Sequence, residues 1–304
     1  MPLFHLVADS TAVLDPSYVA SHDIRVVPLT VIFGTTEYTD GVDITTSEFY
    51  SKFDQSDVPP RTSQPSPGAF AETFSSFDDS LPIMCLTLSS ELSGTYNAAV
   101  QGAASVPGKT VHVIDTRSVG PPLNRIVMHI QELRDRDVSL DEALSCVQTL
   151  IETQIFYFTV PTLEYLRRGG RIGGAQALLG TLLNFRPLLA LVNGRVEPIK
   201  KIRTFSRVLD QMVELIGEAK DRYGSLEVLV ANAHNDEMAS VLIKRGTPYS
   251  VPKPTAIELG PVIVAHTGPG AVGIGFFPLL PEFTPETATP AKLQGSKTTT
   301  SPTE

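Results

Sequence analysis

A hydroxyl-rich segment between residues 89 and 95 carries the clearest chemical signal in this sequence. It follows an apolar run of strand length, residues 83–88, and precedes a helix-like stretch, residues 98–104. The first N–H groups of a helix have no partner within the helix, and the dipole is positive there, so a small anion is favoured. Hydroxyl groups on the turn would add donors. The alternative is that Ser93 serves only as a helix N-cap, a common role for serine.

Two further polar segments are candidate ligand contacts. Asp9, Ser10 and Thr11 directly follow a strand-like run, and the carboxyl ends of strands are where α/β folds bind ligands. An N-cap of the next helix is the alternative for this triplet. Thr62 and Ser63 are predicted to lie on a loop stiffened by flanking prolines, just before a helix. They are either a second site or part of an ordinary turn.

Positively charged side chains gather in two places in the second half of the chain. Arg167 and Arg168 end a short predicted helix, where they would complement the dipole. Arg171 lies between two pairs of glycines, and its small neighbours would let a ligand approach closely. Lys200, Lys201 and Arg203 form the second cluster. Arg171 is therefore the strongest basic candidate.

A glycine-rich segment near the C-terminus contains His266. We interpret residues 260–266 as a strand that ends at this histidine, whose apolar setting requires a partner. Gly268, Gly270 and Gly273 match the spacing of a dinucleotide-binding loop, but a strand-like run follows them instead of a helix. The glycines therefore predict a tight connection between two strands and no nucleotide site.

The order of elements predicts an α/β protein. Strand-like runs and helices alternate in the first half, which implies a largely parallel sheet covered by helices. The second half holds a strand at 154–160, an Asn-Gly hairpin with arms 187–192 and 195–200, and a long amphipathic helix. Residues 281–304, rich in Thr, Pro and Ser, predict a disordered tail.

Composition excludes several functional classes. The net charge of −9 argues against a nucleic-acid partner. Cys85 and Cys146 are too few for a disulfide framework or a thiolate metal cluster. No apolar run approaches membrane-spanning length, and the N-terminus lacks the charged region of a signal peptide. A cytoplasmic location is expected by default.

Taken together, six motifs in sequence order resemble the DegV family. The resemblance runs from about residue 3 to about residue 277, and any one motif alone would be weak. The motifs are Asp9-Ser10-Thr11, Thr62-Ser63-Gln64-Pro65, the segment Ser89–Asn97, Leu163–Ile172 with its Gly-Gly-Arg, Lys201–Thr204, and His266–Gly270.

The resemblance implies two domains with a fatty acid between them. Residues 1–155 would form a mainly parallel three-layer α/β/α domain, and residues 156–280 an α/β domain with a mixed sheet. Family members look like bacterial fatty-acid-binding carriers, not enzymes, that present the acid to a separate kinase for phosphorylation of its carboxylate, a step of phospholipid metabolism. The expected partners are thus a long-chain fatty acid and the catalytic subunit of a fatty acid kinase. No metal, cofactor or nucleic acid is implied, and transient membrane contact is left open.

The resemblance also implies roles for single residues. Thr62, Ser63 and Ser93 would hold the carboxylate, and His266 would join that network. Arg171 would lie beside the carboxylate and stabilise charge once phosphate is added. Arg203 resembles a position that contacts the kinase.

The sequence departs from the family pattern at one place, and two other functions are compatible with its motifs. Pro121 and Pro122 occupy a stretch where the family usually has small residues, which puts the local helix start in doubt. A serine hydrolase with Ser93, His266 and Asp9 as its triad is an alternative, although no G-x-S-x-G elbow surrounds the serine. A binding protein for another small carboxylate or a phosphorylated metabolite is the other alternative.

Overall fold

A four-stranded parallel sheet forms the first half of the protein in the computed structural model, which describes residues 3–78, 80–180 and 185–279. Its strand order is β2-β1-β6-β7, and every pair is parallel. The strands are β1 (His5–Asp9), β2 (Ile24–Val27), β6 (Ile83–Thr87) and β7 (Val111–Asp115). The predicted parallel sheet is confirmed.

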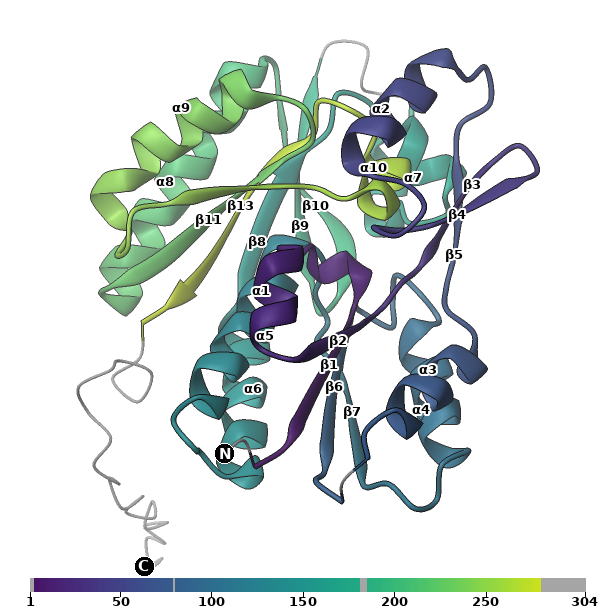
Figure 1. Ribbon diagram of the computed structural model, residues 1–304. Coiled ribbons are helices and arrows are strands. Elements are labelled where there is room, and N and C mark those ends of the chain that lie inside the picture. The colour runs from purple at the N-terminus through teal and green to yellow at the C-terminus, as the bar shows by residue number, and fades with distance from the viewer. Residues whose placement is uncertain (1–2, 79, 181–184, 280–304) are drawn as a thin grey trace, which may run out of the picture.

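Helices cover both faces of this sheet. On one face, α3 and α4 bury Phe70, Phe74 and Ala98 against the strands. On the other face, α5 and α6 bury Ile126 and Val147. The helices are α1 (Pro16–Ser21), α3 (Pro67–Ser75), α4 (Thr95–Ala104), α5 (Pro121–Arg134) and α6 (Leu140–Thr153), with a 3₁₀ turn η1 (Ser10–Ala12) after β1. This part is the predicted three-layer α/β/α arrangement (Figure 1).

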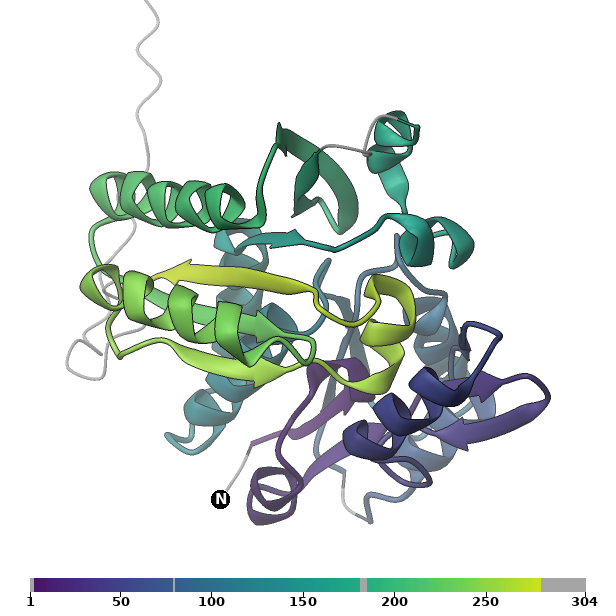
Figure 2. The same cartoon turned by 90° about the horizontal axis from the view of Figure 1, so that it is seen from above.

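A six-stranded mixed sheet forms the second half. Its order is β10-β9-β8-β13-β11-β12, and only β11 and β12 pair in parallel. Helices α8 and α9 lie together on one face (Figures 1 and 2), while the other face looks toward α5 and the first sheet. The elements are β8 (Ile155–Thr159), α7 (Glu164–Arg168), η2 (Gly173–Leu178), β9 (Arg186–Val192), β10 (Arg195–Ile202), α8 (Phe205–Tyr223), β11 (Leu226–Asn232), α9 (Asp236–Gly246), η4 (Thr247–Tyr249), β12 (Thr255–Glu258), α10 (Pro261–Thr267) and β13 (Val272–Pro278).

A third, three-stranded sheet was not predicted. The sequence predicts one strand-like run over residues 24–33, but this run divides at Pro28, which cannot donate to a strand ladder, into β2 and β3 (Thr30–Phe33). The latter pairs with β4 (Thr36–Thr39) and with β5 (Arg61–Ser63), and α2 (Thr46–Gln55) packs nearby. Thr62 and Ser63 therefore lie in a short strand, not on a loop. Figures 1 and 2 place this sheet beside α10.

The predicted strand at 260–266 is wrong, because these residues form helix α10. A short apolar run does not distinguish a strand from a fully buried helix. Pro261 occupies the first helical position, where proline is favoured, and nearly every side chain of the helix is buried. Strand β13 follows Gly268 and Gly270 and contains Gly273, so the glycines connect a helix to a strand and not two strands. The predicted strand after them is confirmed, and no helix N-terminus is available there for a dinucleotide phosphate.

Other local predictions have mixed outcomes. Pro121 and Pro122 begin α5 instead of disturbing it, after Gly120 with its positive φ of 66°. The apolar run 175–183 predicts a helix from sequence, but the structure has a 3₁₀ turn over Gly173–Leu178, and the last residues of the run lie outside the described part. The predicted tail lies outside it too, and the domain limits near residues 155 and 280 stay predictions. Within the described residues, each helix is too short or too polar to span a bilayer.

Candidate functional site

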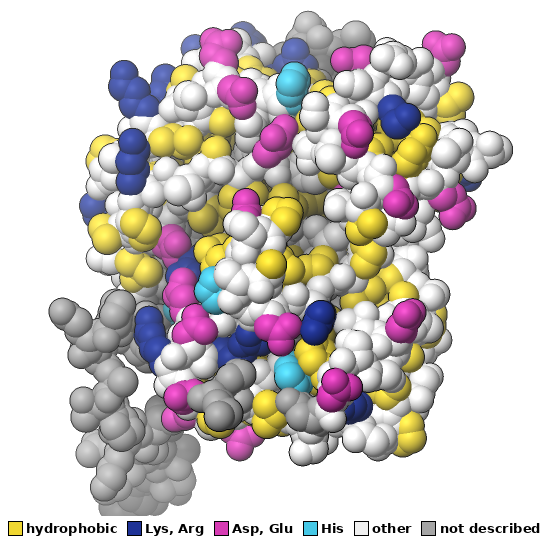
Figure 3. Space-filling view, viewed as in Figure 1, with side chains coloured by type: hydrophobic (Ala, Val, Ile, Leu, Met, Phe, Trp, Pro, Cys, Tyr) yellow, Lys and Arg dark blue, Asp and Glu magenta, His cyan; other side chains and the backbone are white. Residues whose placement is uncertain are grey.

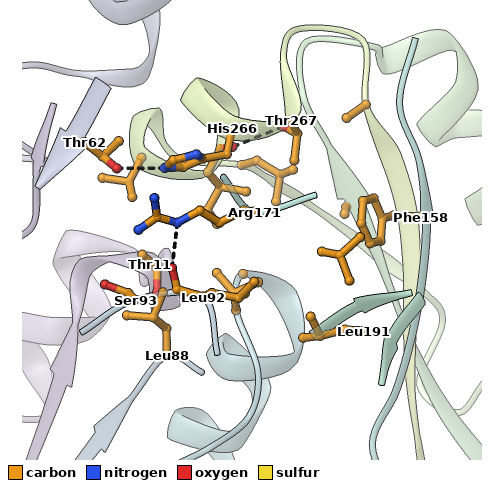
Figure 4. A pocket seen from close by; sticks show the side chains of 18 of the residues that line it. Thr11, Thr62, Leu88, Leu92, Ser93, Phe158, Arg171, Leu191, His266 and Thr267 are labelled. Atoms are coloured by element: carbon orange, nitrogen blue, oxygen red, sulfur yellow. Dashed lines mark hydrogen bonds between the residues drawn. The ribbon is translucent and has the colours of Figure 1, made fainter. Parts of the chain in front are cut away.

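A cavity of about 390 Å³ lies where the carboxyl edge of the parallel sheet faces the mixed sheet. Apolar side chains from several elements line most of it, including Phe158 of β8, Leu191 of β9 and Val262 of α10. Figure 4 shows the polar side chains at one end and Phe158 and Leu191 at the other. The cavity is therefore shaped for a molecule with a long apolar body and one polar end.

Thr62 and His266 meet at the polar end, although they come from distant segments. Thr62 Oγ1 lies 2.7 Å from His266 Nε2, which links β5 to α10. Burial lowers the pKa of His266 to about 4, and the charge of Arg171 acts in the same direction. The ring is therefore neutral near pH 7. The Nδ1 atom of His266 is buried without a hydrogen-bond partner among the described residues. It lies against Gly169, and a Cβ at position 169 would come within 2.1 Å of this nitrogen.

Arg171 lies between this pair and Ser93 (Figure 4). Its Nε donates to the carbonyl oxygen of Leu92 at 2.7 Å, and its Nη1 donates to that of Gly169 at 2.6 Å. These carbonyls fix the guanidinium but carry no formal charge, and the ion pairs found in the described part of the chain do not include Arg171. Burial lowers the pKa of Arg171 from its ordinary value, but the group remains charged. An anion at this end would compensate that charge.

The serines of the hydroxyl-rich segment have separate contacts. Ser89 Oγ donates to the carbonyl oxygen of Gly194 at 2.7 Å, and Ser90 Oγ donates to Asp115 Oδ2 at 2.5 Å. Ser93 lines the cavity, with its Oγ 2.9 Å from Thr95 Oγ1. Gly94, not Ser93, is the N-cap residue of α4, although Ser93 Oγ does accept a hydrogen bond from the N–H of Thr95. Ser93 is thus the serine of this segment that a ligand can reach.

Further hydroxyl groups of the site come from β5, η1 and α10, where Thr267 Oγ1 donates to the carbonyl oxygen of Ile263. Ser63 and Gln64 line the cavity next to Thr62. Gln64 also packs closely on Gly94, and this contact connects the end of β5 with the start of α4. Thr11 lines the cavity as well. Thr62, Ser63, Ser93, Arg171 and His266 therefore line one cavity, whereas Arg203 does not.

The carboxylate of Asp9 has a structural role. Asp9 caps η1, and its carboxylate accepts hydrogen bonds from the N–H of Leu88 at 2.6 Å and from Thr11 at 2.9 Å (N–H) and 2.5 Å (hydroxyl). Burial raises the pKa of Asp9 to about 6. Since His266 contacts Thr62 and Ser93 contacts Thr95, the three side chains do not form the hydrogen-bonded chain of a hydrolase triad.

The other basic residues lie outside this cavity. Arg167 and Arg168 pair with Glu164 at 2.7 and 2.5 Å. Arg203 is exposed in the turn between β10 and α8, in a surface hollow that is also lined by Lys200, Lys201 and Arg207. Figure 3 shows acidic and basic side chains interspersed on the face it presents, with hydrophobic side chains between the upper and lower halves.

A second cavity of about 380 Å³ adjoins the polar end. It shares Thr62, Arg171 and His266 with the first cavity, and Arg61 and Arg168 also line it. The polar end is therefore reached from a basic hollow. In the described residues no group of three or more His, Cys, Asp or Glu stands close enough to hold a metal ion.

Sequence reasoning missed the apolar half of the site. Phe156, Phe158, Leu191 and Val262 line the cavity, but none was singled out. The alternation of Phe156 and Phe158 in a strand-like run was the available signal, because alternate residues share a face of a sheet. Nothing local to Leu191 or Val262 distinguishes them from ordinary core residues.

A family model and two sequence relatives all match this chain to the same protein family. The model of the family described as "Uncharacterised protein, DegV family" matches residues 4–279. A DegV domain-containing protein of Streptomyces coelicolor is 39% identical over 276 residues, covering 88% of this chain and 96% of the relative. A DegV domain-containing protein of Deinococcus radiodurans is 32% identical, covering 90% and 98%.

Solved structures share the whole fold. A DegV family protein from Thermus thermophilus, described by its fatty acid binding, has a TM-score of 0.86 at 33% identity and covers 92% of this chain and 100% of its own. A stearic acid-binding protein from Eubacterium ventriosum has a TM-score of 0.84 at 27% identity, covering 91% and 98%. DegV of Bacillus subtilis, described as a fatty acid binding protein, has a TM-score of 0.81 at 27% identity, covering 91% and 99%. With a family model matched over nearly its entire described length, this chain belongs to the DegV family.

Proposed function

We propose that this protein binds a long-chain fatty acid in the 390 Å³ cavity and presents its carboxylate to a separate kinase. The observation that carries the proposal is the distribution of polarity in the cavity. A half-buried arginine held by two backbone carbonyls, the hydroxyl groups of Thr62, Ser63 and Ser93, and a neutral histidine lie at one end, and mostly apolar side chains line the rest.

The polar end has the donors that a buried carboxylate requires. Removing a carboxylate from water is costly unless hydrogen bonds and an opposite charge compensate it. Arg171 would supply the charge, and Thr62, Ser63 and Ser93 would donate hydroxyl hydrogens. With His266 neutral and its Nε2–H donating to Thr62 Oγ1, the hydroxyl hydrogen of Thr62 would be free for the ligand. The histidine would therefore act through the threonine.

The apolar part of the cavity would supply most of the affinity. Burial of an acyl chain contributes about 0.8 kcal/mol per methylene, so a chain of roughly 14 methylenes would contribute about 11 kcal/mol before the costs of ordering. The fatty-acid-binding descriptions of the Thermus thermophilus and Bacillus subtilis relatives support the same ligand class. Neither a metal nor a nucleotide is needed for this retention.

Presentation to a kinase is supported by the hollow at the polar end. The adjoining cavity is lined by Arg61, Arg168 and Arg171, and it shares Thr62 and His266 with the acyl cavity. A carboxylate oxygen there could attack the γ-phosphorus of ATP held by a kinase, with ADP as the leaving group and an acyl phosphate as the product. Arg171 would stabilise the added charge. Exposed Arg203 would contact the kinase, and we propose a cytoplasmic setting for this exchange.

A titration with matched ligands tests the binding proposal. We expect a long-chain fatty acid to bind far more tightly than the alcohol of the same length, because the alcohol cannot compensate Arg171. We also expect acetate, which lacks the chain, to bind weakly. Equal affinity for acid and alcohol would contradict the carboxylate site, and tight binding of acetate would point instead to a site for a small acid.

A further inference from the structure

The mixed sheet opens beside the apolar end of the cavity. Strands β8 and β9 pair at two positions, Tyr157 with Ala190 and Phe158 with Leu189. The same register would place Phe156 opposite Leu191 as the next pair. Both residues belong to their strands, yet the ladder does not continue to them. The two strands therefore separate at this point, and side chains must fill the gap.

A third cavity lies on the other side of this gap. It measures about 720 Å³ and is lined by α6, the beginning of β8 and the turn between β9 and β10. Phe156 and Leu191 line this cavity and the acyl cavity, and they are the two residues that the described linings share. The pair is thus a wall one side chain thick between the two spaces.

The surroundings of Phe156 hold its ring in this wall. Gly273 and Gly275 on β13 pack against the ring: a Cβ on Gly273 would lie 3.2 Å from a ring carbon, which is a tight contact, and a Cβ on Gly275 would lie 3.5 Å from one, in ordinary van der Waals contact. The ring also stacks on Phe158, with centroids 5.7 Å apart and planes 16° from parallel. Leu191 is less enclosed, being only partly buried. The aromatic ring is therefore the fixed part of the wall, and the leucine is the part that can be changed with less disturbance.

The wall formed by Phe156 and Leu191 lies at the end of the acyl cavity that is far from the charged side chain of Arg171. Figure 4 shows Leu191 and Phe158 across the cavity from Arg171, Thr62 and Ser93. A fatty acid with its carboxylate at Arg171 would direct its methyl end toward this side. The position of the wall therefore limits how far a straight chain can extend.

We propose that Phe156 and Leu191 set the longest acyl chain that this protein accepts, by separating the acyl cavity from the larger cavity beyond. The inference rests on the proposed fatty-acid function and adds its specificity. A smaller residue at either position joins the two cavities, so that a longer chain passes between β8 and β9. A larger residue at position 191 thickens the wall and shortens the chain that fits.

The test compares dissociation constants for saturated straight-chain fatty acids that increase in length by two carbons. Affinity rises about fourfold for each methylene that is buried and stops rising when the chain meets the wall. We expect Leu191→Ala to move the length of tightest binding upward by at least one step. Leu191→Phe should move it downward, which keeps the test decisive if the smaller variant does not fold.

Leu29→Ala is the matched control. Leu29 lines the acyl cavity but not the cavity beyond the wall, so its truncation adds volume without joining the two spaces. We expect its length of tightest binding to match that of the wild type. If the Leu191 variants keep the chain length of tightest binding of the wild type, or if Leu29→Ala shifts that length by as much as they do, the inference is overturned. The fatty-acid site itself would still stand. No binding by the wild type at any length would overturn the proposed function itself.

Discussion

The two ends of the acyl cavity are built from different kinds of structure. The polar end combines side chains from β5, the segment before α4, the turn after α7, and α10. The apolar end is formed largely by neighbouring strands of one sheet, with Phe156 and Phe158 on β8 and Leu191 on β9. The contacts of Thr62 with His266 and of Arg171 with Leu92 therefore join distant parts of the chain, whereas the apolar end follows from strand alternation and register.

This difference separates two properties of the ligand. The polar end should decide whether the ligand carries a carboxylate, and the apolar end should decide how long its chain is. Substitutions at one end should therefore change one property and leave the other.

Arg171→Met should have the largest effect on fatty-acid binding. The substitution removes the positive charge next to the proposed carboxylate and keeps much of the side-chain volume. A hydrogen bond to a charged group is worth about 1.5–3 kcal/mol, so we expect a loss near the upper end, on the order of 100-fold in Kd. Calorimetric titration with one fatty acid measures it.

The alcohol of equal length is the control for this variant. Its affinity should change little, because the alcohol makes no ion pair with Arg171, and the length of tightest binding should stay the same. Equal losses for acid and alcohol would mean that Arg171 only supports the fold, through Leu92 and Gly169.

His266 should make stability depend on pH. Burial lowers its pKa to about 4 in the folded protein, against about 6.5 in the unfolded chain. Between these values the unfolded chain binds the proton and the folded protein does not, so the contribution of His266 to stability falls as the pH is lowered from about 6.5 to about 4. At about 1.4 kcal/mol per pKa unit, the loss is on the order of 1–3 kcal/mol.

Comparison with His266→Gln isolates this contribution. Asp9 and Asp40, whose pKa values burial raises to about 6, contribute with the opposite sign, but equally in both proteins. The difference in unfolding free energy between wild type and variant should therefore shrink toward pH 4 and be constant above pH 7. A difference that is independent of pH would show that His266 is not held neutral by the fold.

Ser93→Ala should weaken binding by about 1.5 kcal/mol, roughly tenfold, through loss of one hydrogen bond to the carboxylate. Ser90→Ala is the matched control, because Ser90 lies three residues away and bonds Asp115 instead of lining the cavity. Both variants should retain the unfolding midpoint of the wild type to within a few degrees. Unchanged affinity of Ser93→Ala in a lipid titration would remove this residue from the carboxylate site.

Arg203→Ala should leave fatty-acid affinity unchanged and slow phosphorylation by a cognate kinase several-fold, since a charge at the rim of an interface acts mainly on association. Arg222→Ala is the control, because it removes an exposed arginine in the last turn of α8, whereas Arg203 precedes the first turn of that helix. Equal initial rates for Arg203→Ala and wild type would exclude Arg203 from the kinase contact.

The sequence predicted the elements of this fold better than their long-range contacts. The parallel sheet, the Asn193-Gly194 hairpin and the buried stripe of α8 follow from local periodicity and turn chemistry, and all are present. The strand predicted at 260–266 failed because an apolar run buried on all sides has no helical period. The contact of Thr62 with His266 spans 204 residues, so no local pattern could reveal it.

Residue types suggested more of the polar end than of the apolar end. Ser93 stood out at a predicted helix start, and Thr62 and Ser63 stood out on a predicted turn before a helix. Arg171 stood out between glycine pairs and His266 in an apolar run, while the resemblance to the DegV family implied their common role. The structure brings all five to one cavity. Phe156 and Leu191 resemble any core residue. Their place in the wall depends on where β8 and β9 separate, which is a property of the assembled sheet.

Mass spectrometry of the small molecules that co-purify with the recombinant protein, after denaturing extraction, would identify the natural ligand. We expect one long-chain fatty acid per protein molecule in the wild type and much less in Arg171→Met prepared in parallel. A small polar acid in the extract, or no bound lipid in a wild-type protein that also fails to bind added fatty acid, would contradict it.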